Sequence, residues 1–223
     1  MSESDLTASV ENYLKAIYDL ERGGAAVATT ALAAQLDVAP ASVTGMVRRL
    51  ADHGLLTHEP YHGVRLTPAG RLGALRTLRR HRVIESYLAK ALGYTWDKVH
   101  DEAEQLEHAA SDELIDRMAA AIGEPSVDPH GAPIPSRAGT IAEETLWSLA
   151  DVKIGAAADV VRIPDEDAEL LRYLDQLEVK PGCAVRVIAR APFGGPITLE
   201  VGGHHRIIGP ALAARLFVRP QGA

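Results

Sequence analysis

The apolar residues of this 223-residue chain change their spacing near residue 160, and that change limits the folds open to it. Over most of the chain before about residue 149 they recur every three to four positions, which is the period of amphipathic helices. From about Val160 they fall in short alternating runs, VVRI, AVRVIAR, ITLEVGG and ARLFVRP, with one short helix near 168–174. This pattern predicts a mainly α-helical chain that ends in a small β-barrel.

The first third of the chain has the element order of a winged helix. Helices are predicted over residues 5–22, in TALAAQLD and in PASVTGMVRRLADHG. Two β-like runs at 55–58 and 64–67 then predict a small hairpin, or wing. Three helices and a hairpin in this order are typical of a winged helix-turn-helix that binds DNA.

The candidate DNA-contacting residues lie in the third helix and the wing. Small side chains at the start of this helix let its backbone approach the major groove, and arginines bind phosphates. A basic run that includes Arg76 and Arg79 follows nearby. The candidates are Ala39, Pro40, Ala41, Ser42, Thr44, Gly45, Arg48, Arg49, His62 and Arg65.

Two long helices are predicted in the middle of the chain, over 68–92 and from about 96 to 122. A loop rich in Pro and Gly follows, and then an amphipathic helix from about 141 to 149. The net charge of the chain is −7, but residues 93–150 alone carry 12 acidic and 3 basic side chains. The mildly basic first third is therefore expected to bind a polyanion, and the acidic middle region is expected to bind cations.

Six side chains of the middle region have the spacing of metal ligands. His81 and Glu85 are four residues apart on one predicted helix, and four more lie on the next one within an arc of roughly 100°. These four are His100, Glu104, Glu107 and His108. The apolar stripe beside them, Val99, Ala103, Leu106, Ala110 and Leu114, predicts that they line the edge of the core. Carboxylates in that position are costly unless they are paired or bind a metal.

The residue types of the chain exclude several classes of protein. Cys183 is the single cysteine, which excludes a disulfide framework and thiolate-rich metal sites. Nitrogen and oxygen ligands favour Mn²⁺ or Fe²⁺. A di-metal carboxylate enzyme needs Glu-x-x-His, but Gln105 stands three residues before His108, and HExxH, P-loop and GxSxG motifs are absent. Because these catalytic motifs are absent, we expect that the protein is not an enzyme. Because the chain has no long apolar run and no signal sequence, we expect a cytoplasmic protein without a membrane partner.

Several motifs of the chain resemble the diphtheria-toxin-repressor and iron-dependent-regulator family, including its manganese-transport-repressor branch. They are ENYLKAIYDLE, PASVTGMVRRL, RHRVIESYL, VHDEAEQLEH, HGAPIP and IIGPALAARLFV. The resemblance implies a winged helix-turn-helix domain at 1–75, a helical metal-binding and dimerisation domain at 76–150 and an SH3-like (FeoA-like) domain at 151–223. It also implies a homodimer whose metal-loaded form binds a palindromic DNA operator and represses metal-uptake genes, without a small-molecule substrate.

The resemblance assigns metal ligands by position. His81, Glu85 and His100 match an ancillary site, whereas Glu104, Glu107 and His108 match the primary site. Iron-type members have Cys at the position of Glu104 and manganese-type members have Glu. Mn²⁺ is therefore expected, with Fe²⁺ second and Co²⁺, Ni²⁺, Cd²⁺ or Zn²⁺ as surrogates. Asn12 stands where a Met or Asp ligand is expected, and Asp165 is a candidate ligand from the C-terminal domain.

Two other functions are compatible with the sequence. The chain could be a winged-helix regulator whose His and Glu residues are structural, in which case a chelator would not change its DNA affinity. It could instead be a metal-buffering accessory protein, in which case it would show no sequence-preferring DNA binding.

Overall fold

The computed structural model describes residues 7–21, 24–59, 63–142, 144–165 and 167–221. Its contacts divide the chain into two compact units. The first unit comprises residues 1–81, 105–112 and 135–141, and the second comprises 82–104, 113–134 and 142–223. In the described part of the chain, no helix combines the length and the apolar character needed to span a bilayer.

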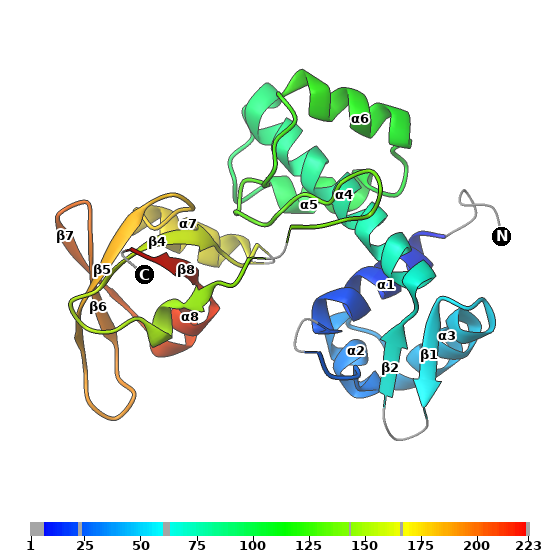
Figure 1. The fold of residues 1–223 in the computed structure, drawn as a ribbon, viewed down its shortest axis with the longest axis horizontal. Helices are drawn as coiled ribbons and strands as arrows, with labels where there is room; N and C mark the ends of the chain where they lie inside the picture. The colour runs from blue at the N-terminus through cyan, green and yellow to red at the C-terminus, as the bar shows by residue number, and fades with distance from the viewer. Residues whose placement is uncertain (1–6, 22–23, 60–62, 143, 166, 222–223) are drawn as a thin grey trace. The chain divides into compact units, whose positions relative to one another are not determined.

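The predicted winged helix-turn-helix is present in the first unit (Figure 1). Its helices are α1 (Ala8–Leu20), α2 (Thr29–Gln35) and α3 (Pro40–Asp52). The Thr7 hydroxyl caps α1 by accepting a hydrogen bond from the Val10 amide, and Pro40 occupies the first turn of α3. The apolar faces of these helices meet in one buried core that includes Leu14, Ile17, Leu32, Val47 and Leu50.

The hairpin packs against this helical core. Strands β1 (Leu56–Glu59) and β2 (Gly63–Leu66) pair antiparallel, with Leu56 opposite Leu66. Val64 is fully buried and exchanges two backbone hydrogen bonds of 2.9 Å with Val27, in the segment that follows α1. The hairpin is thereby fixed to the helices by a third extended segment. The tip, which includes the DNA-contact candidate His62, lies outside the described residues.

Helix α4 (Pro68–Leu92) begins and ends where the sequence predicts. The Thr67 hydroxyl accepts a hydrogen bond from the Gly70 amide at the start of the helix. Gly93 follows the end of the helix with a φ of 72°, a left-handed conformation that glycine adopts readily because it has no side chain. The boundary between the two units falls within this helix, after His81.

The single helix predicted from 96 to 122 is wrong. The chain forms α5 (Val99–Leu106) and α6 (Asp112–Ala121), and a turn separates them. The amides of Ala109 and Ala110 both donate to the Leu106 carbonyl, which ends α5. The predicted apolar stripe is therefore also interrupted: Val99 and Ala103 are buried, but Leu106 and Leu114 are exposed.

The C-terminal part of the second unit is one six-stranded antiparallel sheet with the order β3-β8-β4-β5-β6-β7 (Figure 1). Its strands are β3 (Trp147–Ser148), β4 (Ala157–Arg162), β5 (Ala184–Arg190), β6 (Ile197–Val201), β7 (His204–Ile208) and β8 (Phe217–Pro220). Helices α7 (Ala168–Gln176) and α8 (Pro210–Arg215) complete it. Strand β7 and helix α8 are not among the elements that the apolar pattern predicts.

The helix predicted from 141 to 149 is also wrong. Trp147 and Ser148 form β3 beside β8, and the Ser148 hydroxyl accepts a hydrogen bond from the Ala150 amide. This contact caps a single 3-10 turn, Leu149–Asp151. Leu149 is fully buried in the core of the sheet, so tertiary packing outweighs the helical spacing of this segment.

Candidate metal centres and DNA-binding helix

Six charged or titratable side chains form a linked set in the first unit, and we call this set the helix-one cluster. They come from α1, from α4 and from the turn after α5. Their contacts run continuously from one side chain to the next. The cluster comprises Glu11, Lys15, Arg80, His81, Glu107 and His108.

Glu107 lies at the centre of the helix-one cluster and is fully buried. Its Oε1 accepts a hydrogen bond from Lys15 Nζ at 2.8 Å, and its Oε2 lies 2.6 Å from Nδ1 of His81. Burial alone would raise the pKa of Glu107, but the hydrogen bond from His81 and the charge of Lys15 together hold that pKa below its usual value. Glu107 is therefore an ionised carboxylate in a dry site.

His108 connects Glu107 to Glu11. Its Nδ1 lies 2.6 Å from Oε2 of Glu11, which also forms an ion pair with Arg80. Its Nε2 is buried, lies 3.4 Å from Oε1 of Glu107 and has no hydrogen-bond partner among the described residues. When Nδ1 donates to Glu11, Nε2 presents a lone pair to a carboxylate, and these two repel unless a cation lies between them.

Asn12 follows Glu11 in α1, and its Oδ1 is likewise buried without a hydrogen-bond partner among the described residues. A buried amide oxygen normally accepts a hydrogen bond. The buried imidazole nitrogen of His108 beside an ionised carboxylate, and the buried amide oxygen of Asn12, are atoms of the kind that bind a divalent cation.

A second set of potential metal ligands lies entirely within the second unit, and we call it the Glu85 cluster. Glu85 comes from α4, Asp128 and His130 from the loop after α6, and Asp165 from the segment after β4. One ligand atom of each lies within 4.8 Å of those of the other three. Nδ1 of His130 is 3.8 Å from Oε1 of Glu85 and 3.9 Å from Oδ2 of Asp165.

Backbone groups orient the loop residues of the Glu85 cluster. Oδ1 of Asp128 accepts hydrogen bonds from the amides of His130 (2.8 Å) and Ala132 (2.9 Å). Nε2 of His130 donates to the Trp96 carbonyl at 2.8 Å, so its Nδ1 carries the lone pair. Asp128 Oδ2 and His130 Nδ1 are buried without a hydrogen-bond partner among the described residues. Both atoms therefore offer lone pairs at the cluster.

The Glu85 cluster carries more negative than positive charge. Burial, and then the nearby charge of Glu85, raise the pKa of Asp128 to about 6. Arg82 lies 3.5 Å from Oδ2 of Asp128 and opposes this shift. Three carboxylates around one imidazole form a hard, oxygen-rich ligand set, which suits a divalent cation such as Mn²⁺.

Gly131 allows the loop that carries Asp128 and His130 to approach β4 closely. Its φ is +87°, and a Cβ built on it would lie 1.8 Å from the Val161 carbonyl oxygen. We expect Gly131→Ala to destabilise the metal-free protein by about 3 kcal/mol, because backbone strain and overlap add. Gly123 is a matched control, since its φ is +83° but its Cβ would meet no atom within 4 Å. Gly123→Ala should cost about 1 kcal/mol in urea unfolding, and equal losses would contradict this account.

Helix α3 presents its small and basic residues to solvent. Val43, Val47 and Leu50 are buried on one side of the helix. On the other side the exposed residues are Ala41, Ser42, Thr44, Gly45, Arg48 and Arg49, and Ala39 and Pro40 are exposed at its start. The Thr44 hydroxyl donates to the Pro40 carbonyl, and Arg65 of the wing donates to the Gly24 carbonyl. An exposed helix face of this kind can enter a major groove.

Comparison with known proteins identifies the family. The iron-dependent repressor N-terminal DNA-binding domain matches residues 5–64, the iron-dependent repressor metal-binding and dimerisation domain matches 67–136, and the FeoA domain matches 147–220. The iron-dependent repressor IdeR of Mycobacterium tuberculosis is 31% identical over 219 residues, which cover 93% of this chain and 94% of IdeR. The chain belongs to the iron-dependent repressor family.

Solved structures of repressors share the whole fold of this family member. A manganese-dependent transcriptional repressor in complex with manganese is 37% identical, with a TM-score of 0.89 over 95% of this chain and 99% of that one. ScaR with bound Zn²⁺ is 30% identical, with a TM-score of 0.82 over 94% of this chain and 98% of that one. The family is one of metal-dependent transcriptional repressors that bind DNA.

The structure places the predicted ligands of this family member in both units. Glu107, His108 and His81 lie in the helix-one cluster, and Asn12 adjoins it. Glu85 and Asp165 meet in the Glu85 cluster, and Nδ1 of His100 is 3.5 Å from Oε1 of Glu85. Glu104 lies half-buried on α5. Glu107 and His108 follow α5 rather than forming a stripe on it, which corrects the helical geometry from which they were selected.

Three potential metal ligands of the two clusters, Glu11, Asp128 and His130, were not predicted from the sequence. Asp128 and His130 belong to the motif DPHGAPIP, where two potential ligands alternate within a loop of Pro and Gly. This combination is the sequence feature that could have indicated a metal site. Glu11 adjoins Asn12 in α1, but one acidic residue in the first turn of a helix is common and indicates no site by itself.

Proposed function

We propose that this protein is a metal-activated repressor, with Mn²⁺ as its first cofactor and Fe²⁺ as the alternative, that acts as a homodimer on a palindromic operator in the cytoplasm. The two clusters carry this proposal, because each holds buried lone pairs beside carboxylates that need a cation. Solved relatives bind manganese and Zn²⁺. Co²⁺, Ni²⁺ and Cd²⁺ are expected surrogates, because affinity for such sites follows the Irving–Williams order rather than physiological use.

The proposed ligands of the first centre are Glu107 and His108, with the amide oxygen of Asn12. Those of the second centre are Glu85, Asp128, His130 and Asp165. His81, His100 and Glu104 are proposed as further ligands on the resemblance of their positions. A bound divalent cation would supply positive charge among these carboxylates, in place of the charge that Lys15 now supplies to Glu107.

The helix-one cluster explains how metal binding would act on DNA binding. Glu11, Asn12 and Lys15 lie on α1, whose apolar face with Leu14 and Ile17 is part of the winged-helix core. Holding Asn12 to Glu107 and His108 would fix α1, and with it the DNA-binding domain. A preference of about 1 to 3 kcal/mol for this arrangement changes DNA affinity roughly 5- to 150-fold.

Arg48 and Arg49 are proposed phosphate contacts. Each is exposed on α3, and replacing either with Ala should weaken binding to all DNA sequences and lower the salt-dependence slope by about 1. Arg117 is the control, because it is exposed on α6 and ion-paired with Glu113. Fluorescence anisotropy at several salt concentrations measures the slope, and an unchanged slope in both α3 variants would reject the assignment.

Anisotropy with genomic DNA fragments tests the proposal itself. At fixed ionic strength, the protein in chelator should bind weakly, and titrated Mn²⁺ or Fe²⁺ should produce sequence-preferring binding. DNA binding that a chelator does not change would favour a metal-independent winged-helix regulator. Metal binding without any sequence-preferring DNA binding would favour a metal-buffering protein.

A further inference from the structure

Trp96 contacts the metal-ligating imidazole of His130 in two ways. Its backbone carbonyl accepts the hydrogen bond from His130 Nε2 at 2.8 Å. Its indole ring stacks on the imidazole, with ring centroids 5.9 Å apart and an interplanar angle of 25°. One residue therefore constrains both the tautomer of His130 and the orientation of its ring plane.

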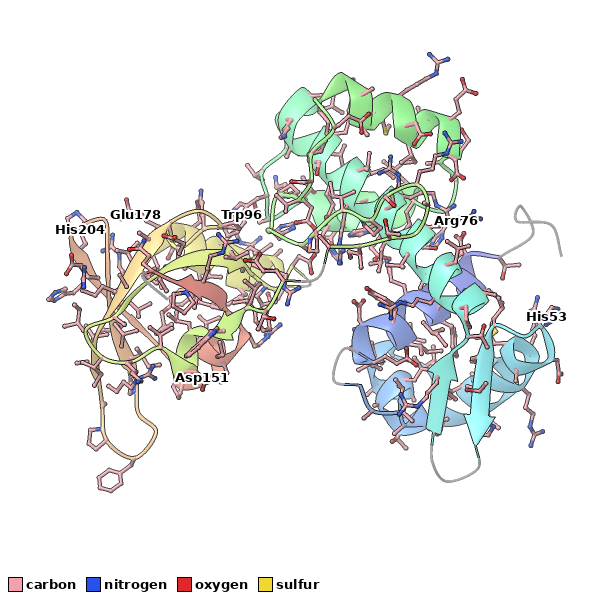
Figure 2. All side chains as sticks on the ribbon, viewed as in Figure 1. His53, Arg76, Trp96, Asp151, Glu178 and His204 are labelled. Carbon is pink, nitrogen blue, oxygen red and sulfur yellow. The ribbon has the colours of Figure 1, made fainter. Side chains whose placement is uncertain are left out.

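The sheet domain in turn holds Trp96 in place. Trp96 lies in the segment between α4 and α5, and its side chain packs against the apolar core of the sheet (Figure 2). Nζ of Lys180, in the loop after α7, lies 5.5 Å from the centre of the indole ring. The adjacent Asp97 forms an ion pair with Arg172 of α7. Packing and charge thus fix this segment within the second unit.

His130 needs such support because its side chain makes little other directional contact at the cluster. Nδ1 is 3.8 Å and 3.9 Å from the nearest oxygens of Glu85 and Asp165, beyond hydrogen-bond distance. The imidazole is completely buried, so solvent does not hold it either. The carbonyl and ring of Trp96 are therefore the contacts that aim Nδ1 at the cluster.

We propose that Trp96 is a positioning residue that sets the metal affinity of the Glu85 cluster by holding His130 in the Nε2–H tautomer with Nδ1 toward the ligand atoms. This inference rests on the proposed function of the Glu85 cluster as a metal site. Partners that orient metal-ligating histidines typically change metal affinity 10- to 100-fold when they are removed.

Three substitutions in the full-length protein test this role. Trp96→Leu keeps apolar bulk but removes the ring, and it should weaken Mn²⁺ binding at the Glu85 cluster about tenfold. Trp96→Phe keeps a stacking ring and should restore affinity to within about twofold of the wild type. Trp147→Leu is the matched control, because Trp147 lies on β3 and is 48% exposed. Competition with a chelating dye measures each Mn²⁺ dissociation constant.

The imidazole ¹⁵N chemical shifts of His130 supply a second readout, which does not depend on metal binding. In the metal-free wild type they should show the Nε2–H tautomer. Trp96→Leu should keep this tautomer because the backbone carbonyl of residue 96 remains, so weaker Mn²⁺ binding in that variant would report the loss of the stacked ring. The Nδ1–H tautomer in the wild type, or wild-type affinity in Trp96→Leu, would overturn the inference. His130→Ala separates the two hypotheses: if it leaves Mn²⁺ binding unchanged, the Glu85 cluster is not a metal site and the proposed function fails there.

Discussion

Replacing Glu107 with Gln should abolish the dependence of DNA binding on Mn²⁺ while the protein remains folded. Glu107 is the fully buried carboxylate at the centre of the helix-one cluster, and its lowered pKa keeps it ionised. A neutral amide of the same size removes the charge that a divalent cation needs from this ligand. Operator affinity in Mn²⁺ should fall to its value in chelator, a loss of up to about 150-fold.

Gln is a better substitution than Ala for this test, because it retains part of the contacts with Lys15 and His81. The Gln oxygen can still accept a hydrogen bond, whereas Ala would leave the Lys15 ammonium and the His81 ring beside a cavity. We expect Glu107→Gln to cost about 2 kcal/mol of stability, since a hydrogen bond to a charged group is replaced by one to a neutral group.

Glu113→Gln is the control for this experiment. Glu113 is an exposed acidic residue on α6, paired with Arg117, so its loss of charge should leave both stability and the response to Mn²⁺ unchanged. Anisotropy titrations with and without Mn²⁺, together with thermal unfolding in chelator, measure both quantities. A full Mn²⁺ response in Glu107→Gln would remove Glu107 from the ligand set.

The sequence predicted elements whose apolar faces meet a large local core. Helices α1, α3 and α4 show the helical period because residues such as Leu14, Val47 and Leu78 all face one core. The break between α5 and α6 could not be predicted in this way. It places Glu107 against Lys15, which is 92 residues away in sequence, and periodicity does not report such a contact.

Spacing along expected helices selected candidate ligands on α4 and near α5, but it did not select the ligands in the loop after α6. Glu85 and His81 have helical spacing on α4, so the pattern shows them together. Asp128 and His130 lie in a loop, where the path is set by hydrogen bonds from backbone amides and by the positive φ of Gly131. Their position beside Glu85 is a tertiary property, because α4 and the loop are separated by two further helices.

Asp128→Asn should have opposite effects in the absence and presence of metal. The pKa of Asp128 is about 6 in the folded protein and 3.8 as its ordinary value. Between these two values the folded state retains a proton that the unfolded state has lost, so metal-free wild type should lose stability as the pH rises from about 4 to about 6. The full loss is about 3 kcal/mol, since each pKa unit corresponds to about 1.4 kcal/mol.

Asn has no proton to lose, so the substitution should remove this pH dependence and stabilise the metal-free protein at pH 7 by up to about 3 kcal/mol. Its side-chain oxygen can still accept the hydrogen bonds from the amides of His130 and Ala132. In Mn²⁺ the wild type should instead be more stable than Asp128→Asn. A carboxylate binds the cation more strongly than an amide does, and bound metal stabilises the fold. Thermal unfolding at pH 5 and 7, in chelator and in Mn²⁺, measures all four cases. If Asp128→Asn destabilises the metal-free protein at pH 7, the buried charge is already compensated without metal, and the Glu85 cluster is structural.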